Sequence, residues 1–243
     1  MFVKGDDFSW TISIEKEDQM DEKELKELGM SNLDKVLRAL DEGNIEEARR
    51  SAQIMEKEAK HAHDLMVNFV WILLTYIGKN FGEDKIVDAL HFRHSVQEQV
   101  AEKMLGMSPE DAVRFKTMIH RAHHSNITMT EERDRYVMKL DPCNTGGRML
   151  REGPDLGKTK KPIPESWSRT GISYYCTHCA FHSITSVKKG APHPTWVYER
   201  SDNPEAPCYQ YCYKTTEAVP AKSFEELGLK KPPSSTTASK KKS

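Results

Sequence analysis

The chain has 243 residues, of which 37% are hydrophobic and 30% are charged, and its formal net charge is −1. This length can bury one large core or two small ones, and the composition is that of a folded chain. The nearly balanced charge argues against a general nucleic-acid-binding protein, because such modules usually carry a clear basic excess.

The first residues and the apolar segments argue against secretion and against a membrane span. The opening segment, MFVKGDDFSW, lacks the basic stretch and apolar run of a secretion signal. The longest apolar run, over 65–77, is shorter than the roughly 20 residues that a transmembrane helix needs. Five cysteines are an odd number without secretory cues, so we expect reduced thiols, a cytoplasmic location and no membrane partner.

Residues 1–20 are the first segment with a clear pattern. Phe8, Trp10, Ile12 and Ile14 alternate with more polar neighbours. Alternation with a period of two predicts a strand with one buried face.

Residues 21–127 are predicted to form a bundle of about three to four helices. The long helices are expected over 44–78, 83–105 and 108–125. Asn44, with Glu47 three residues later, predicts a capping box at the start of the first of them. Ser108, followed by Pro109 and two acidic residues, predicts the start of the last.

Residues 128–213 are predicted to form a cysteine-rich α+β region. Strands are expected over 133–140, 171–179 and 195–200, a short helix over 180–190 and an exposed loop over 150–170. The tail over 214–243 is rich in Lys, Ser and Pro, and we expect it to be mobile. The predicted fold class is therefore α+β, with an N-terminal helical bundle followed by a small cysteine-bearing antiparallel sheet.

Four of the five cysteines form two closely spaced pairs. Cys176 and Cys179 are three residues apart, and Cys208 and Cys212 are four residues apart. A short pair lets neighbouring backbone turns aim two thiolates at one ion, and a second pair completes a tetrahedron. The spacing predicts a zinc site, and the alternative is that some of these cysteines are small buried apolar residues.

Other groupings of metal ligands fit the same segment. His178 and His182 could each replace one of the thiols. A different set would use Cys143 with Cys176 and Cys179, which leaves an open position on zinc or on an iron or iron–sulfur centre. The sequence does not separate three ligands from four.

The fifth cysteine lies in a glycine-containing turn, LDPCNTGGRM. Gly146 and Gly147 free the backbone so that amide groups can converge beside Cys143, and Arg148 adds a positive charge. Such a turn could lower the pKa of the thiol or hold an anionic group of a cofactor or substrate. The alternative is a tight turn in which the glycines serve geometry only.

The order of these features resembles that of the hydrolases that open L-2-amino-thiazoline-4-carboxylic acid. A helical first half leads to a strand that ends in a cysteine (YVMKLDPC), then to the segment YYCTHCAFH and to an aromatic-flanked cysteine (PCYQYCYK). The resemblance covers about residues 130–214, and the helical half only in outline. It implies that Cys143, Cys179 and Cys212 act in hydrolysis at a C–N or C–S bond.

The chain also departs from the pattern of that family. Cys176 and Cys208 are additional, and His182 follows the middle cysteine where the family has an acid. The substrate and a metal role therefore stay open.

Histidines are concentrated on the predicted helices. His94 falls on the helix face that carries Val87 and Leu90, where a polar group needs a partner, and His123 lies near the apolar stripe of the next helix. Imidazoles directed at one interior predict a metal centre or a general acid/base pair. The alternative is that each is a hydrogen-bonded or surface residue.

Two classes of function fit these observations. The first is a hydrolase or lyase that acts on a C–N or C–S bond of a small anionic molecule. In it, the turn at Cys143 supplies a nucleophile or ligand, Arg148 and the glycine amides hold negative charge, and His94 or His123 moves protons. The second is a non-catalytic interaction module held by a structural four-cysteine zinc site. A homo-oligomer is left open, and no nucleic acid is expected.

Overall fold

The structure is a computed structural model that describes residues 21–96, 105–154, 156–201 and 203–233. It has helices first and a four-stranded antiparallel sheet after them, so the predicted α+β class is confirmed. The chain forms two compact units, Met1–Met66 and Val67–Ser243. The strand predicted over 1–20 lies outside the described residues.

Helix caps define the elements of the first unit. Helix α1 (Glu22–Gly29) begins with a capping box at Asp21. Helix α2 (Asn32–Asp41) is capped by Ser31, whose side chain accepts a hydrogen bond from the backbone amide of Asp34. The two helices are joined by Arg38, whose Nη1 and Nη2 donate to the carboxylate of Glu27 at 2.6 and 2.9 Å. A bidentate pair of this kind fixes orientation as well as distance.

The long helix α3 (Ile45–Asn80) contains the boundary between the units. Its start is the predicted one, since the side chain of Asn44 accepts from the amide of Glu47 at 3.1 Å. Gly82, with a φ of +99°, follows its end, and glycine is the residue type that tolerates this conformation. No helix among the described residues has an apolar stretch long enough to cross a membrane.

Two further helices precede the sheet in the second unit. Helix α4 (Asp84–Val96) agrees with the prediction as far as Val96, and residues 97–104 lie outside the described part. Helix α6 (Pro109–Ala122) begins as predicted, because Ser108 Oγ accepts from the amide of Asp111 at 3.1 Å.

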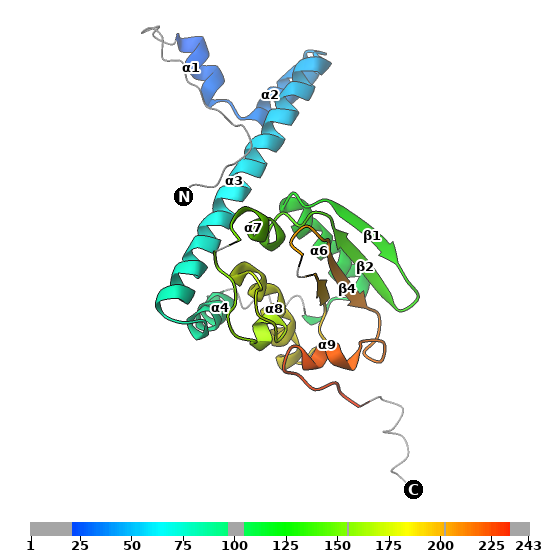
Figure 1. The fold of residues 1–243 in the computed structure, drawn as a ribbon. Coiled ribbons are helices and arrows are strands. Elements are labelled where there is room, and N and C mark those ends of the chain that lie inside the picture. The colour runs from blue at the N-terminus through cyan, green and yellow to red at the C-terminus, as the bar shows by residue number, and fades with distance from the viewer. Residues whose placement is uncertain (1–20, 97–104, 155, 202, 234–243) are drawn as a thin grey trace. The chain divides into compact units, whose positions relative to one another are not determined.

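The sheet has the order β1-β2-β4-β3, and every neighbouring pair is antiparallel (Figure 1). Its strands are β1 (Ile127–Glu131), β2 (Arg135–Leu140), β3 (Val197–Arg200) and β4 (Cys208–Tyr213). The strands predicted over 133–140 and 195–200 are confirmed as β2 and β3. Strands β1 and β4 were not predicted.

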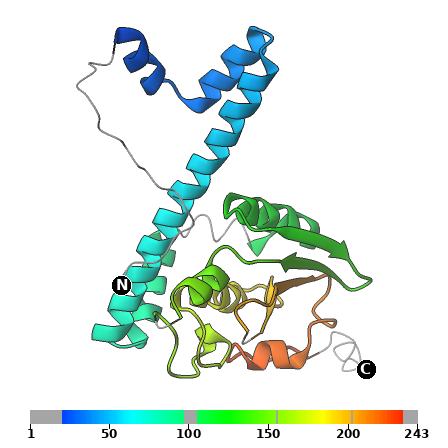
Figure 2. The same ribbon diagram turned by 45° about the horizontal axis from the view of Figure 1, so that its top comes forward.

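One face of the sheet forms the main core with α6 and with helix α8 (Thr177–Lys188). Met138 and Leu140 of β2 are fully buried on this face, opposite Gln210 and Cys208 of β4. The other face packs against helix α9 (Ala221–Glu225), and Figure 2 shows α6 and α9 on different sides of the strands.

The strand predicted over 171–179 is wrong. The segment instead forms a short 3-10 helix, η2 (Tyr174–Cys176), that continues directly into α8. Consecutive side chains from Ile172 to Tyr174 are all buried, whereas a strand with one covered face would bury every second one. Elsewhere in the loop region are helix α7 (Gly146–Glu152) and a second 3-10 turn, η1 (Pro164–Ser166).

The prediction of a mobile tail from 214 onward is wrong for the described residues 214–233. Val219 and Phe224 are fully buried and pack with Tyr213 against the sheet. Leu227 is also buried, in the main core. A few apolar side chains in a lysine-rich segment are enough to anchor it when each is completely covered.

The Phe224→Ala variant should lower the free energy of unfolding by about 3–5 kcal/mol, because it removes a fully buried aromatic ring and leaves a cavity. Urea denaturation followed by circular dichroism measures the change. The exposed neighbour Lys222 is the control, and Lys222→Ala should change stability by no more than about 0.5 kcal/mol. Equal stability of the two variants would show that the segment is not anchored.

Candidate functional site

A cavity of about 470 Å³ lies in the second unit, between α4, α6 and α8. Four histidines line it, two from the first half of that unit and two from α8: His94, His123, His178 and His182. Their rings are close, with centroids of His178 and His182 at 6.0 Å and of His94 and His182 at 6.5 Å. The structure therefore brings the four histidines singled out in the sequence to one place.

The cavity wall is basic and apolar. Arg93, Lys116 and Lys189 contribute to it, and no Asp or Glu does so among the described residues. Aromatic and aliphatic side chains, including Phe115 and Trp196, form much of the rest. Such a wall suits a small molecule that has an anionic group on an apolar body.

One imidazole of this cavity is held in its neutral form. Burial lowers the pKa of His182 to about 3, and the charges of His178 and Arg93 act in the same direction. The neutral ring can accept a hydrogen bond, and Nη1 of Arg93 lies 3.1 Å from its Nε2. This contact positions the guanidinium at the cavity wall.

Cys179 and His178 form a thiol–imidazole pair beside the cavity, at the first turn of α8. The Sγ atom of Cys179 lies 3.6 Å from Nε2 of His178. On the other side of the ring, Nδ1 is in hydrogen-bond contact with the carbonyl oxygen of Tyr175, which requires a proton on Nδ1. The Nε2 atom of the neutral ring is then free to take the proton of the thiol.

A tyrosine and a lysine extend this pair. Tyr198 of β3 makes a hydrogen bond with Cys179, and Nζ of Lys116 donates to the hydroxyl of Tyr198 at 3.0 Å. Burial and the neighbouring thiols raise the pKa of Tyr198, so its hydroxyl keeps its proton. Lys116, Tyr198, Cys179 and His178 are thus joined in one chain of polar contacts.

The pKa of Cys179 is lowered to about 6. Burial opposes this shift, but the charge and hydrogen bond of His178, followed by the charges of Lys116 and Arg200, outweigh it. A position in the first turn of a helix favours the thiolate as well. These surroundings favour the thiolate form of Cys179 over the neutral thiol.

The other thiols near α8 stay neutral. Burial raises the pKa of Cys176 to about 12 and also raises the pKa of Cys208, although Arg200 acts in the opposite direction on both. Nη1 of Arg200 donates to the Sγ atom of Cys176. Burial likewise raises the pKa of Cys212 to about 12.

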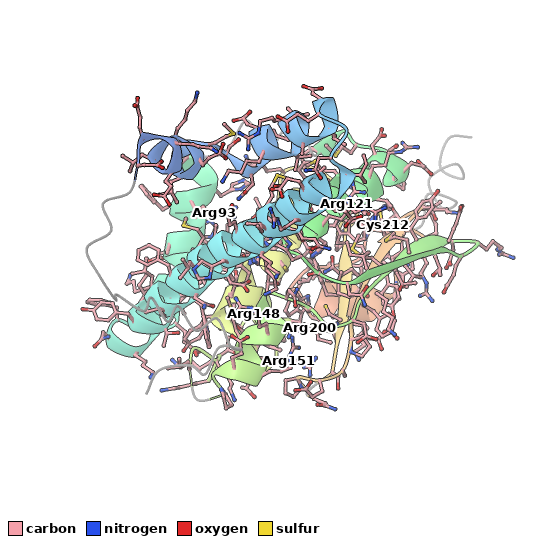
Figure 3. All side chains as sticks on the ribbon, turned by 90° about the horizontal axis from the view of Figure 1, so that it is seen from above. Arg93, Arg121, Arg148, Arg151, Arg200 and Cys212 are labelled. Atoms are coloured by element: carbon pink, nitrogen blue, oxygen red, sulfur yellow. The ribbon has the colours of Figure 1, made fainter. Side chains whose placement is uncertain are left out.

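The metal clip predicted from the two cysteine pairs is not assembled in the described part of the chain. Cys208 and Cys212 lie at the two ends of the extended strand β4, so their Cα atoms are about 13 Å apart, whereas a zinc–sulfur bond is about 2.3 Å long. Figure 3 shows Cys212 well away from Arg200, which contacts Cys176. No set of three or more His, Cys, Asp or Glu side chains is placed to hold a metal among the described residues. Zinc and iron stay predictions from the sequence.

The glycines after Cys143 are closely packed, and their predicted role in holding an anionic group stays a prediction. A Cβ atom at Gly146 would lie 2.0 Å from the Sγ atom of Cys176, and one at Gly147 would lie 3.0 Å from Cβ of Cys143. Cys143 itself is buried, with its Sγ atom 3.3 Å from Oγ1 of Thr145. Cys143 does not line this cavity.

Arg148, the predicted anion-holding residue, ties α7 to α3. Its buried guanidinium donates to Glu152 at 2.7 Å, to Oδ1 of Asn68 at 3.0 Å and to the carbonyl of Asn144 at 3.1 Å. Arg148 does not line the cavity.

Sequence reasoning missed Lys116 and Tyr198. The alternation in TWVYER could have indicated that Trp196 and Tyr198 share one face of a strand. Nothing in the sequence connects that strand to Lys116, which is 82 residues away.

Comparison of the chain with protein-family models, with curated proteins and with solved structures finds no match.

Carbamidomethylation by iodoacetamide should reveal one fast-reacting thiol, whose rate rises with pH through about 6, because only the thiolate reacts. The Cys179→Ser variant should lose this reaction, and His178→Gln should move the midpoint up toward the ordinary thiol value. Peptide mass spectrometry of the labelled protein identifies the thiol. A midpoint near 9, or fast labelling of another cysteine, would contradict the assignment.

The Gly146→Ala variant should lower the free energy of unfolding by about 3 kcal/mol, because its Cβ atom has no room beside Cys176. Gly106→Ala is the matched control, since a Cβ atom there meets nothing within 4 Å, and its effect should stay within about 0.5 kcal/mol. Urea denaturation of both variants measures the difference. Equal effects would mean that α7 and Cys176 are not in tight contact.

Proposed function

We propose that the protein is a cysteine-dependent hydrolase that acts on a C–N or C–S bond of a small anionic molecule. Cys179 is the nucleophile and His178 is its base and acid. The observation that carries the proposal is the contact of 3.6 Å between Sγ of Cys179 and Nε2 of His178, next to a cavity with a basic wall.

The orientation of the imidazole supports this assignment. The contact of Nδ1 with the carbonyl of Tyr175 fixes the tautomer, so Nε2 faces the thiol. A nucleophile, a base and a third group that orients the base are the parts of known thiol and hydroxyl hydrolases. Here a backbone carbonyl orients the base.

The reaction would proceed in two halves. The thiolate of Cys179 attacks the electrophilic carbon, a bond forms between Sγ and that carbon, and the electrons of the broken C–N or C–S bond leave with the departing atom. Protonated His178 gives its proton to this leaving group. Water, deprotonated by His178, then attacks the covalent intermediate and releases the thiolate.

The cations of the wall would bind the substrate. Arg93, fixed by its contact with His182, and Lys116 can each hold an anionic group such as a carboxylate. Phe115 and Trp196 cover the apolar part of the molecule. His94 and His123, predicted from the sequence to move protons, line the same cavity.

The family resemblance supports the same class of bond. It implicates Cys143, Cys179 and Cys212, and the properties of their surroundings favour one of the three. Cys143 is buried beside Thr145, and Cys212 has a raised pKa and lies in the sheet, with Sγ 3.8 Å from the carbonyl of Pro109. The lowered pKa of Cys179 makes it the best nucleophile among them.

The test is turnover of L-2-amino-thiazoline-4-carboxylic acid and related cyclic amidines, thioesters and amides, followed by mass spectrometry of the products. Cys179→Ser should lower kcat by about 10³-fold or more, and His178→Gln by about 10²–10⁴-fold. Cys212→Ser, which changes a neutral buried thiol, should keep kcat within a few fold. Full turnover by Cys179→Ser, or its loss in Cys143→Ser with Cys179 intact, would refute the assignment.

A further inference from the structure

Cys179 is the most accessible of the five cysteines of the chain. It is partly exposed, whereas the other four are buried: Cys143, Cys176, Cys208 and Cys212. Its Sγ atom lies 3.6 Å from Nε2 of His178, a residue that lines the cavity. A small oxidant that reaches His178 through the cavity therefore meets Cys179 before any other thiol.

Cys176 is a second thiol at disulfide spacing from Cys179. Turn η2 ends at Cys176 and α8 continues from Thr177 without a break, and both of these residues have helical backbone angles. Residues three apart on a helix share a face, with Cα atoms about 5 Å apart. Disulfides join cysteines whose Cα atoms are about 4.4–6.8 Å apart. The backbone therefore already has the required spacing, and only the two side chains have to turn.

The other three cysteines belong to different elements. Cys143 precedes α7, and Cys208 and Cys212 lie on strand β4. A bond from Cys179 to any of them would have to join two separate elements of the fold. The distance between Cys176 and Cys179 is set by the helix alone, so Cys176 is the natural partner.

Arg200 links the two thiols of α8 electrostatically. Its Nη1 donates a hydrogen bond to the Sγ atom of Cys176. Its charge favours the thiolate of Cys176 and also that of Cys179. A cation beside two sulfur atoms promotes the nucleophilic form of whichever sulfur attacks.

We propose that Cys179 and Cys176 form a disulfide when the protein meets hydrogen peroxide or an alkyl hydroperoxide, so that this turn is a site of reversible oxidation. The thiolate of Cys179 attacks the hydroxyl oxygen of the peroxide. An S–O bond forms, the O–O bond breaks, and the departing hydroxide or alkoxide takes its proton from protonated His178. Cys179 is then a sulfenic acid, and the peroxide has been reduced to water or an alcohol.

Cys176 completes the oxidation. Its Sγ atom attacks the Sγ atom of the sulfenic acid, an S–S bond forms and the S–O bond breaks. The hydroxyl group leaves with the proton of the Cys176 thiol as water. Together the two sulfurs lose two electrons, which are the two that reduce the peroxide.

The disulfide occupies the sulfur that the proposed hydrolase needs as its nucleophile, so turnover would stop until a dithiol reduces the bond. This consequence rests on the proposed function. The disulfide itself does not rest on it, and its test makes no use of turnover.

Treatment of the folded full chain with hydrogen peroxide, followed by iodoacetamide and peptide mass spectrometry, tests the site. Trypsin releases both cysteines in one peptide, residues 170–188. After oxidation this peptide should be lighter by two hydrogens and carry no label, and dithiothreitol should restore labelling of both thiols. In chains unfolded by urea, the preference of peroxide for Cys179 should disappear.

Variants separate the two steps. Cys176→Ser should stop the oxidation at the sulfenic acid of Cys179, which dimedone traps. His178→Gln should slow the oxidation of Cys179 by at least about 10-fold. Cys208→Ser, which removes another buried cysteine, is the matched control and should form the same disulfide. Circular dichroism checks that each variant is folded.

Three outcomes in the unmodified chain would overturn the proposal. The peptide could keep both thiols free while peroxide oxidises other cysteines, a disulfide could join Cys179 to Cys143 or Cys208, or Cys179 could become a sulfinic acid without any disulfide. Oxidation of His178→Gln at the unmodified rate would overturn the role given to the imidazole.

Discussion

The first turn of α8 is fixed by two contacts at the sulfur of Cys176, and the arrangement of the candidate site depends on it. Gly146 leaves the space into which this sulfur packs, and Arg200 donates a hydrogen bond to it. Because a helix advances by about 100° per residue, fixing Cys176 also fixes the direction of the next residues. His178 is consequently turned to the cavity, and Cys179 lies beside it, with its Sγ atom 3.6 Å from Nε2 of His178.

Much of the helical part could be predicted because its signals are local. The caps at Asn44 and Ser108 are formed by side chains within three residues of the amides that they accept from. Segments whose structure depends on distant partners were predicted wrongly. Tyr174 lies in a segment whose sequence is typical of a strand. Its hydroxyl instead donates a hydrogen bond to the carboxylate of Glu83, 91 residues away, at 2.9 Å. Phe224 is buried only because the sheet lies beside it.

The sequence indicated which residue types form the candidate site, but not which of these residues lie together in the fold. The sequence singled out the histidines, and His94 and His178 do meet at one cavity. The spacing of Cys208 and Cys212 suggested a chelating turn, because spacing alone does not distinguish a turn from a strand. The low pKa of Cys179 results from His178 and from charges far along the chain, and only the folded structure brings these together.

Strand β4 reads CYQYCY, with Cys208, Gln210 and Cys212 buried on the face of the main core and the tyrosines on the opposite face. The side chains of the buried set are smaller than the tyrosines, and each is almost completely covered. A slip of one residue in the pairing with β2 would exchange the two sets, so the alternating sizes permit a single alignment of the strands. The cysteines of this strand thus act as spacers that select the register, a task that requires no reactivity of their sulfur atoms.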